Sequence, residues 1–289
     1  MEVGVSMEAA ETVRFAPAGR IAQRFVAARL NAMALDGYPG PIPPDLASGY
    51  ECQEAAIALW ADVIAGWKIG RIPPAFEQKL GQARLAGPIF RREVQKATAA
   101  KVVEFGVFVG GIAAVEAEYI FEIAKDAPAG QMRWSLNDAA AIVGRMLVGM
   151  EAAGSPLATI NKLGPTVVVS DFGNNAGLIL GPEVSGWRER TPSDLTCETF
   201  IDGKSVGQGA AASIFGGPLG ALQFVAEHCA RRGRPLKAGM LISTGAATGI
   251  HDIASGQEAC AEFKGIGTIR CMAKPRVPQK QQTPANLAK

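Results

Sequence analysis

The sequence predicts an α+β fold, with helices gathered in the first hundred residues and short strands after them. Residues 21–33 and 48–64 carry apolar side chains at helical spacing. From about residue 101 onward, short alternating or β-branched runs are separated by glycines, which is typical of strands joined by turns. Because the strands cluster rather than alternate with helices, α+β is favoured over a βαβ arrangement.

The N-terminal region is predicted to hold two helices and a short strand. The helix at 21–33 breaks in the turn-rich segment 38–44. A second helix is predicted at 48–64, with Gly66 as the residue that stops it, and a strand at 67–69 follows. The chain is thus divided into a mainly helical region (1–100), a β-rich core (101–272) and a tail. The tail, 273–289, is rich in Pro, Gln and Lys and is expected to be disordered.

The β-rich core is predicted to contain several strands and two helices. Strands are expected at 115–123, 166–170, 178–180, 196–201 and 240–243. Asp202-Gly203 is a hairpin signal after the fourth of these strands. Helices are expected at 136–148 and 219–231.

Composition restricts the class of protein. The chain has 289 residues, 48% hydrophobic and 19% charged, enough for a large core and too apolar for disorder. Its net charge of +2 gives no electrostatic footprint for nucleic acid or an anionic membrane. The five cysteines form no C-x-x-C pair, and no apolar run suits a signal peptide or a membrane span. We therefore expect a soluble cytoplasmic protein with free thiols.

A pair of glutamates, Glu116 and Glu118, is the most informative feature of the sequence. They lie in an alternating run, so that in a strand both carboxylates stand on one face while apolar residues occupy the other. Adjacent carboxylates repel unless a proton or a cation lies between them, and hard oxygen ligands favour Mg²⁺, Mn²⁺ or Ca²⁺. A half-buried strand whose polar face meets water is the alternative, and on this segment alone it is the stronger one.

Other catalytic patterns are weak. Asp202-Gly-Lys-Ser205 matches only the end of a phosphate-binding loop, and the glycines at 106–111 lack dinucleotide-binding spacing. Only two histidines are present, His228 and His251, which leaves a Ser-His-Asp mechanism or a histidine zinc site poorly supplied. In an enzyme, carboxylates and a lysine must carry the chemistry.

An ordered set of short motifs links the chain to a known family. The motifs are P-P-D-L-A-S-G-Y at 43–50, G-W-K-I-G at 66–70, V-E-A-E at 115–118, M-E-A-A-G-S at 150–155, N-N-A at 174–176, P-L at 218–219, P-L-K-A-G at 235–239 and S-T-G at 243–245. With this set the chain resembles the fumarylacetoacetate hydrolase superfamily. The closer likeness is to its branch of 2-keto-4-pentenoate hydratases and 4-oxalocrotonate decarboxylases, which act in aromatic meta-cleavage pathways.

The resemblance implies a fold and a site. The fold would be a mixed β-sandwich or β-roll core, and Glu116, Glu118 and Glu151 would hold one Mg²⁺ or Mn²⁺. Lys68 would be the active-site lysine, Thr244 would contact the substrate carboxylate, and Gly245 beside it would also bind the substrate. From the residues alone, Glu151 also reads as a helix-end carboxylate, Lys68 as a solvated lysine and Thr244 as an ordinary strand-end residue.

The chain also departs from the family pattern. The family's Pro-Asp-Phe-Gly reads Arg-Leu-Ala-Gly at 84–87, so Leu85 replaces an aspartate implicated in proton transfer. Arg71-Ile-Pro replaces Leu-Thr-Ser, Asn-Asn-Ala-Gly at 174–177 replaces Asp-Asn-Ala-Ser, and Gly-Gly-Pro-Leu at 216–219 replaces Gly-His-Pro-Leu. The hydrolytic branch's lid histidine has no counterpart. Leu85 is expected to form an apolar wall beside the substrate.

Three functions follow from the resemblance. The first is a metal-dependent hydratase that converts a 2-hydroxy-2,4-dienoate into a 4-hydroxy-2-oxo acid. The second is a decarboxylase of a 2-oxo-3-enedioate, for which Arg71 would bind the distal carboxylate unless it is merely a surface arginine. The third is a ligand-binding homologue without turnover. In each case the partner is a small 2-oxo or 2-hydroxydienoic acid, with no nucleic acid or membrane, and the protein is expected to form a homo-oligomer.

Overall fold

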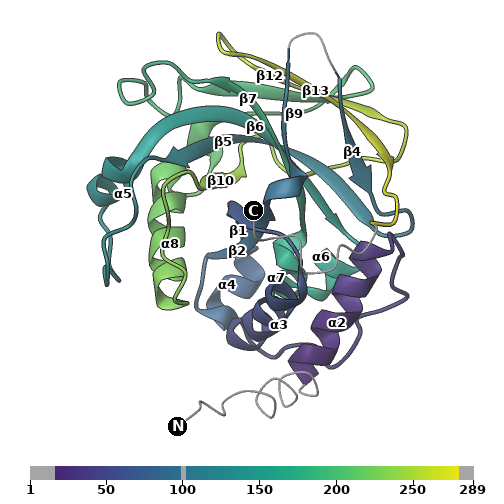
Figure 1. The fold of residues 1–289 in the computed structure, drawn as a ribbon. Coiled ribbons are helices and arrows are strands. Elements are labelled where there is room, and N and C mark those ends of the chain that lie inside the picture. The colour runs from purple at the N-terminus through teal and green to yellow at the C-terminus, as the bar shows by residue number, and fades with distance from the viewer. Residues whose placement is uncertain (1–16, 99–101, 280–289) are drawn as a thin grey trace.

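The computed structural model describes residues 17–98 and 102–279 as two stacked sheets with helices below them (Figure 1). A five-stranded sheet lies over a strongly curved eight-stranded sheet, and helices α2, α3 and α7 lie beneath the curve. The predicted α+β class and layered β core are confirmed. No helix in the described part of the chain combines the length and apolar character needed to cross a membrane.

The eight-stranded sheet carries most of the residues predicted to form the site. Its order is β2-β1-β10-β5-β6-β7-β3, with β11 paired to β5. Pairs β1/β10 and β3/β7 are parallel and the others antiparallel. The bounds are β1 Ile64–Arg71, β2 Arg84–Phe90, β3 Val94–Lys96, β5 Ile112–Ile123, β6 Val143–Ser155, β7 Asn175–Glu183, β10 Leu241–Ala246 and β11 His251–Asp252.

The five-stranded sheet has the order β4-β13-β12-β8-β9. Its strands are β4 Val103–Val107, β8 Thr196–Ile201, β9 Lys204–Ala210, β12 Glu258–Phe263 and β13 Gly267–Pro275. Asp202 and Gly203 have φ of 48° and 75°, as a two-residue type I′ hairpin turn requires. The predicted hairpin between β8 and β9 is therefore confirmed.

Helices cover the free face and edge of the large sheet. They are α2 Pro17–Leu30, α3 Leu46–Leu59, α4 Pro74–Leu80, α5 Leu136–Ile142, α6 Ile160–Leu163, α7 Pro165–Ser170 and α8 Gly217–Arg231, with 3-10 turns η1 Arg91–Glu93, η2 Phe172–Asn174 and η3 Ala211–Ser213. The predicted helix at 219–231 matches α8. Asp45 begins α3 by accepting a hydrogen bond from the Ser48 amide at 2.8 Å.

The main core lies between the two sheets and confirms the alternation read from β5. Val115, Ala117, Tyr119 and Phe121 are fully buried and belong to the apolar cluster that includes residues of the upper sheet. Burying side chains of this kind stabilises the fold by about 1.5–3 kcal/mol for each large one. The opposite parity of β5 therefore faces the helical side, where Glu116 and Glu118 stand.

Three predicted elements are wrong in part. The β-branched run 166–170 is helix α7 rather than a strand, because Gly164 and Pro165 start a helical turn whose valines pack in the small core beneath the sheet. The predicted helix 136–148 ends at Ile142, and the chain continues as strand β6. The second predicted helix stops at Leu59, and residues from Ile64 onward form β1.

The predicted division at residue 100 does not separate two units, because β1, β2 and β3 belong to the large sheet. The expectation of disorder from residue 273 is also wrong for the first residues of the tail. Strand β13 continues to Pro275, and the Gln279 amide donates to the Leu30 carbonyl at 2.7 Å. Residues 280–289 lie outside the described part of the chain.

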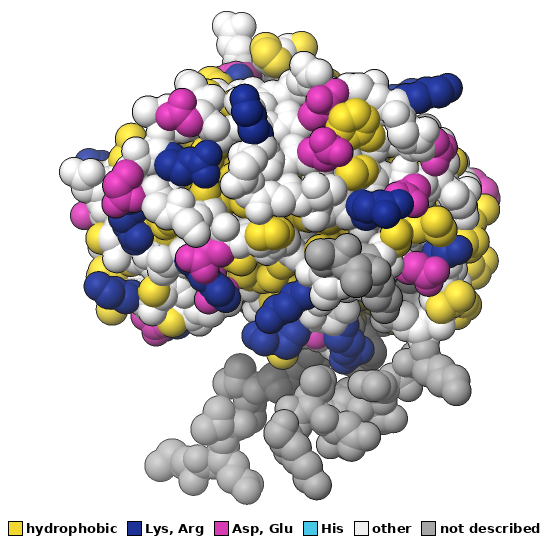
Figure 2. All heavy atoms as spheres, turned by 90° about the horizontal axis from the view of Figure 1, so that it is seen from above, with side chains coloured by type: hydrophobic (Ala, Val, Ile, Leu, Met, Phe, Trp, Pro, Cys, Tyr) yellow, Lys and Arg dark blue, Asp and Glu magenta, His cyan; other side chains and the backbone are white. Residues whose placement is uncertain are grey.

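Surface charge and thiols agree with the composition. Figure 2 shows basic and acidic side chains interspersed on the face that it presents. All five cysteines are free, as predicted.

Candidate metal and substrate site

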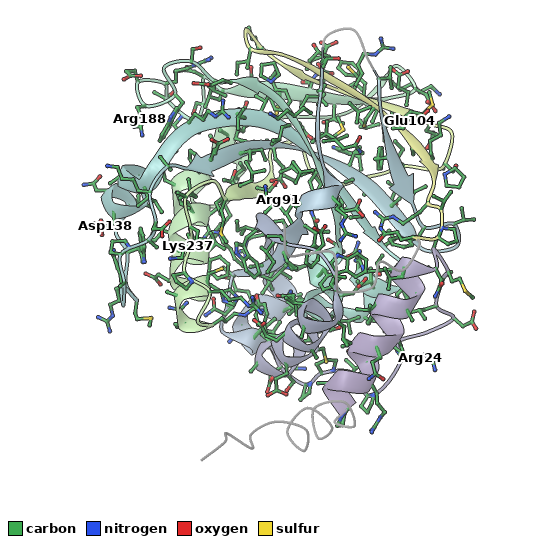
Figure 3. The ribbon with its side chains drawn as sticks, viewed as in Figure 1. Arg24, Arg91, Glu104, Asp138, Arg188 and Lys237 are labelled. Atoms are coloured by element: carbon green, nitrogen blue, oxygen red, sulfur yellow. The ribbon has the colours of Figure 1, made fainter. Side chains whose placement is uncertain are left out.

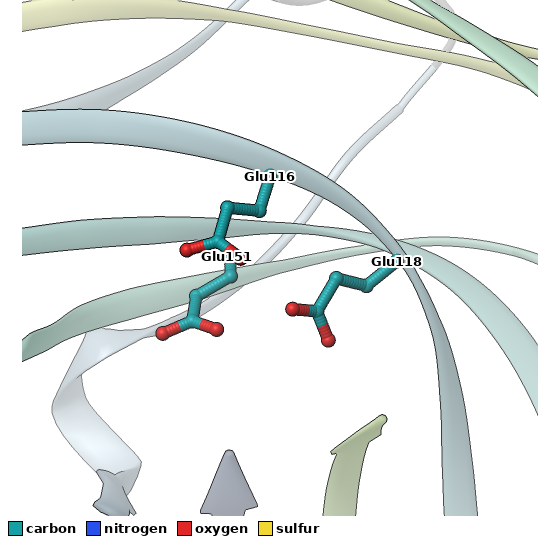
Figure 4. Close-up of side chains that lie close together, drawn as sticks. All are labelled: Glu116, Glu118 and Glu151. Carbon is teal, nitrogen blue, oxygen red and sulfur yellow. The ribbon is translucent and has the colours of Figure 1, made fainter. Parts of the chain in front are cut away.

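The three predicted metal ligands come together beneath the curve of the large sheet. Antiparallel pairing of β5 and β6 places Glu116 directly opposite Glu151, and Glu118 stands two residues along β5 on the same face. One carboxylate oxygen from each residue lies within 4.8 Å of the others. Figure 4 shows the three carboxylates directed into the same space. The helix-end alternative for Glu151 is wrong, because this residue lies within strand β6.

Hydrogen bonds fix two of these carboxylates and leave one oxygen of each without a partner. Glu118 Oε2 accepts from Ser243 Oγ at 2.6 Å and from the Gly245 amide at 2.9 Å. Glu151 Oε1 accepts from Asn175 Nδ2 at 3.0 Å. Glu118 Oε1 and Glu151 Oε2 are buried and have no hydrogen-bond partner among the described residues. Buried anionic oxygens of this kind are costly unless a ligand satisfies them.

Lys68 provides the positive charge of this group. Its side chain extends from β1, is 3% exposed and places Nζ 3.3 Å from Glu151 Oε1. Nζ also donates to Asn174 Oδ1 at 3.1 Å. The alternative of a solvated lysine is therefore wrong. Burial by itself would lower the pKa of Lys68, but the attraction of the three glutamates outweighs it and raises the pKa above its ordinary value.

The carboxylates themselves are difficult to ionise together. Burial, with a smaller contribution from Glu151, raises the pKa of Glu116 to about 7 although Lys68 lowers it. Burial and the two neighbouring carboxylates raise the pKa of Glu118 well above its ordinary value. Lys68 alone does not balance three carboxylates, and two of their oxygens lack partners. Hard oxygen ligands, excess negative charge and unsatisfied oxygens together fit a divalent cation.

A cavity of about 630 Å³ opens beside this cluster. We call the cluster of Lys68, Glu116, Glu118 and Glu151 the cavity floor. Two of its members, Lys68 and Glu116, line the cavity directly. Every predicted substrate-binding residue also lines it: Arg71, Leu85, Thr244 and Gly245. The volume is in the range of small-molecule sites.

The predicted substrate-binding residues differ in how much of their polar chemistry is free. Thr244 Oγ1 donates to the Tyr119 carbonyl at 2.6 Å, so only its lone pairs are available to a ligand. Leu85 is 4% exposed and stands opposite Gly70 in the β1/β2 pairing. It thus presents an apolar surface to the cavity, and its contact with a substrate stays a prediction. The Arg71 guanidinium lies 2.5 Å from Glu77 Oε2 at the outer edge of the cavity.

Asn174 is a site residue that the sequence did not identify. It ends a turn in which Phe172, Gly173 and Asn174 all have φ near +60° (55°, 62° and 55°). Gly and Asn adopt this left-handed conformation more readily than other residues do. Gly87 allows this turn to approach β2, since an added Cβ there would lie 2.0 Å from the Phe172 carbonyl oxygen. The turn directs the Asn174 amide to Lys68. The Asn-Asn motif was the available signal, but it could not show the contact.

Arg84 is the second residue that sequence reasoning missed. It is the first residue of β2, lines the cavity and donates to the Phe215 carbonyl. We call Arg71, Arg84 and Phe215 the cavity mouth. From the sequence, an arginine at a strand end is expected to be exposed to solvent. Only the fold shows that Arg84 lies at a cavity.

Comparison with known proteins assigns the fold. No family model matches the chain. A 4-oxalocrotonate decarboxylase from Pseudomonas putida and a 2-keto-4-pentenoate hydratase from Burkholderia vietnamiensis are each 28% identical over 102 residues. Each match covers 35% of this chain and 39% of the relative, so the similarity spans well under half of either curated protein.

Solved structures extend the likeness across the chain. A 4-oxalocrotonate decarboxylase from Pseudomonas putida G7, complexed with magnesium and adipate, superposes with a TM-score of 0.74 at 20% identity over 94% of this chain and all of that one. A fumarylpyruvate hydrolase from Pseudomonas aeruginosa, in complex with Mn²⁺ and pyruvate, gives 0.55 at 13% identity over 75% of this chain and 97% of that one. The chain therefore has the fold of the fumarylacetoacetate hydrolase superfamily, as its motifs predicted. The two curated relatives are a decarboxylase and a hydratase, and the first of these structures is a decarboxylase.

Proposed function

We propose that the protein is a metal-dependent lyase that adds water to a 2-hydroxy-2,4-dienoate and so forms a 4-hydroxy-2-oxo acid. One observation carries this proposal: three buried carboxylates, two with unpartnered oxygens, meet a buried lysine at the edge of a small-molecule cavity. The proposed cation is Mg²⁺ or Mn²⁺, in keeping with the magnesium and manganese in the two structures described above. The substrates we propose are ring-cleavage products of aromatic compounds.

The chain's own residues account for binding and proton transfer in this mechanism. A cation on the floor would supply Lewis-acid stabilisation of the negative charge that develops on a 2-oxo acid. Lys68, which contacts Glu151 at the cavity floor, would donate a proton to the carbon skeleton or stabilise the developing charge. Asn174 holds Nζ in place. Thr244 and Gly245 line the cavity, and Thr244 would donate to a substrate carboxylate if its hydroxyl turned from the Tyr119 carbonyl.

Decarboxylation of a 2-oxo-3-enedioate is the second candidate, and Leu85 favours it. An apolar wall disfavours a carboxylate beside it more than it disfavours neutral CO₂. Leu85 also stands where the family resemblance implies an aspartate, so the site lacks an acid–base group that hydration would use. Both reactions share the stabilised enolate, so the floor alone does not separate them.

An ultraviolet assay of dienol loss, run with and without Mg²⁺ and coupled to detection of CO₂, tests the proposal. We expect metal-dependent loss of dienol without CO₂. Release of one CO₂ per dienol or enedioate consumed would replace hydration with decarboxylation. Tight binding of a 2-oxo acid with no turnover of either substrate class would instead identify a binding homologue.

A further inference from the structure

Arg29 is a buried cation that the mechanism above does not use. It lies near the end of helix α2, and only 2% of its surface is exposed. Its guanidinium pairs with the equally buried Asp171, with Nε 2.5 Å from Oδ1 and Nη2 3.0 Å from Oδ2. Removing two such charges from water costs free energy that their attraction does not always recover, so the pair is weak evidence of a stabilising role. Its value to the protein therefore depends on what else the guanidinium contacts.

The other donors of Arg29 reach backbone carbonyls around the turn at residues 172–174, which we call the site turn. Nη1 donates to the Asn175 carbonyl at 3.0 Å, and Nη2 donates to the Gly154 carbonyl at 3.1 Å. Asp171 precedes the site turn and Asn175 follows it, while Gly154 lies on β6, the strand that carries one of the floor glutamates. One planar guanidinium thus ties both ends of the turn to each other and to that strand.

The site turn has a backbone that needs such support. Its first residue, Phe172, has a φ of 55°, which a large side chain adopts only where its surroundings hold it. The Arg29 guanidinium carbon lies 5.1 Å from the centre of the Phe172 ring, and the rings of Trp60 and Phe90 pack edge-on against the same ring. Arg29 therefore holds the strained residue by its ring and the adjoining residues by their polar groups.

The asparagines in and after the site turn connect it to the cavity floor. Asn174 Oδ1 accepts from Lys68 Nζ at 3.1 Å, and Asn175 Nδ2 donates to Glu151 Oε1 at 3.0 Å. Lys68 Nζ lies 3.3 Å from the same Glu151 oxygen, so the two asparagines act on one ion pair. Among the described residues, Arg29 forms no hydrogen bond with either member of that pair. Its influence on the floor must pass through the turn.

A second arginine holds the same segment from the other end of the chain. Arg276, which follows β13, donates to the Ala176 carbonyl at 3.2 Å. The guanidinium carbons of Arg29 and Arg276 lie 5.5 Å and 4.9 Å from the centre of the Phe108 ring. The consecutive carbonyls of Asn175 and Ala176 are thus each held by an arginine from a distant part of the sequence. This arrangement indicates that the position of the segment, rather than a single contact, is what the arginines maintain.

We propose that Arg29 is a positioning residue of the candidate active site, which acts by holding the site turn in place. The amide oxygen of Asn174 then meets Lys68. The amide nitrogen of Asn175 likewise meets Glu151. Because hydrogen bonds are directional, the fork of Arg29 fixes the turn more narrowly than apolar packing would. The kinetic consequence rests on the proposed function, whereas the consequence for Mg²⁺ binding rests only on the floor.

Two variants separate positioning from folding. Arg29→Lys keeps a cation for Asp171, but one nitrogen replaces a planar fork and cannot hold the carboxylate and both carbonyls together. Arg29→Met combined with Asp171→Asn removes both buried charges, whereas Arg29→Met alone would leave Asp171 uncompensated. The control is Arg24→Met, which removes an exposed arginine from the outer side of the same helix (Figure 3) and should behave as the wild-type protein does.

Calorimetry with Mg²⁺ tests the inference without relying on turnover. Both Arg29 variants should bind Mg²⁺ about 10-fold more weakly, the lower end of the span for residues that orient a metal ligand, because Glu151 loses a fixed partner. The doubly substituted variant should unfold near the wild-type temperature, since replacing a buried ion pair by neutral groups is often neutral. Its weaker Mg²⁺ binding would then have no explanation in loss of folding.

Kinetics with the dienoate in saturating Mg²⁺ tests the route through Asn174. Arg29→Lys should lower kcat about 10-fold with little change in KM, because Lys68 acts on the transition state. Asn174→Gly removes the amide without straining the turn. In the Asn174→Gly background, Arg29→Lys should lower kcat by at most about 3-fold, because two substitutions on one route are not additive.

Each outcome has a distinct meaning. Wild-type Mg²⁺ affinity and kcat in both Arg29 variants would overturn the inference, and Arg29 would be a structural residue. Equal loss of kcat from Arg29→Lys in the wild-type and Asn174→Gly backgrounds would overturn it too, because independent effects multiply. A wild-type protein that binds Mg²⁺ but converts no dienoate would refute the proposed function alone, and the calorimetric comparison would still decide the role of Arg29.

Discussion

The floor and the mouth of the cavity are built in different ways. The floor residues lie within strands β1, β5 and β6, where register fixes each side chain: Glu116 must face Glu151, and Lys68 lies opposite Ser243 of β10. The mouth is formed by the last pair of the β1/β2 ladder, Arg71 and Arg84, and by Phe215 in the segment before α8. The motifs that carry the family resemblance include the floor residues, and three of the departures from that resemblance lie at the mouth or beside it. Side chains inside a ladder are held by their neighbours on both sides, whereas side chains at strand ends can change with less disturbance to the sheet.

The two regions also have opposite charge. The floor holds three carboxylates and one lysine, and the mouth holds two arginines of which one is paired with Glu77. A divalent cation at the floor would offset the excess negative charge there.

The largest expected effect is at the floor. Lys68→Met should lower kcat by about 10²–10⁴-fold, the usual contribution of a positioned proton-transfer group. KM should change much less, since the lysine acts mainly on the transition state. Steady-state kinetics in saturating Mg²⁺ measures both quantities.

The metal must be present in this experiment because Lys68→Met leaves three buried carboxylates without their cation. Lys79→Met on α4 removes an exposed lysine and serves as the control. Near-full activity of Lys68→Met would show that another group transfers the proton, and the floor would then be only a metal site.

A smaller but still large effect is expected for the metal ligands. Glu118→Gln keeps the side-chain shape and an acceptor for Ser243, but it removes one charge from an oxygen-ligand site. We expect Mg²⁺ affinity to fall by about 100-fold or more by calorimetry. The apoprotein should become more resistant to heat, because a repelling buried carboxylate is gone.

Glu122→Gln is the matched control, since Glu122 lies on the same strand with the same parity but pairs with Arg145 at 2.8 Å. It should bind Mg²⁺ as the wild-type protein does. If Glu118→Gln also kept its affinity, the three glutamates would not be the metal site.

This contrast also explains what the sequence could predict. Alternation along 115–123 placed Glu116 and Glu118 on one face correctly, because a period of two is a local property. Glu151 was identified from its motif, but the segment before it, 136–148, was predicted to be a helix. In β6 the partners β5 and β7 determine the structure, and tertiary pairing overrides local propensity.

The contacts of Asn174 and Arg84 lay beyond sequence reasoning for a different reason. Asn174 reaches Lys68 only through a turn with three positive φ values, which packs against Gly87. Arg84 reaches the cavity only because β2 pairs with β1 and ends against α8. Each contact joins segments that are distant in the sequence, and no local pattern encodes such a meeting.

A moderate effect is expected for the residue that holds the lysine. Asn174→Ala removes the acceptor for Lys68 Nζ and should lower kcat by roughly tenfold, as expected for one hydrogen bond to a charged group. Asn174→Asp keeps an acceptor oxygen and should restore most of the rate. Asn174→Gly separates the loss of the amide from backbone strain, because glycine accepts positive φ.

Asn161→Ala is the control, because Asn161 contacts Asn174 at 3.2 Å but forms no hydrogen bond with Lys68. It should change kcat little. Equal effects of Asn161→Ala and Asn174→Ala would mean that the turn acts through general packing, and the position of the lysine would not depend on its amide partner.

The smallest effect tests the wall between the two regions. Leu85 is buried against Gly70 and lines the cavity, so each methylene added to the far end of a monocarboxylic dienoate should gain about 0.8 kcal/mol, a few-fold in kcat/KM. Monocarboxylic substrates are used so that the far end of each molecule carries no charge. Leu85→Ala should reduce this gain per methylene, and Leu85→Asp should abolish it, because a charge replaces the apolar surface. Leu180→Ala, a buried leucine on β7 that does not line the cavity, controls for loss of packing. Fastest turnover of the smallest dienoate, with no response to Leu85→Asp, would show that the substrate does not pass along this wall; floor and mouth would then not act on one molecule.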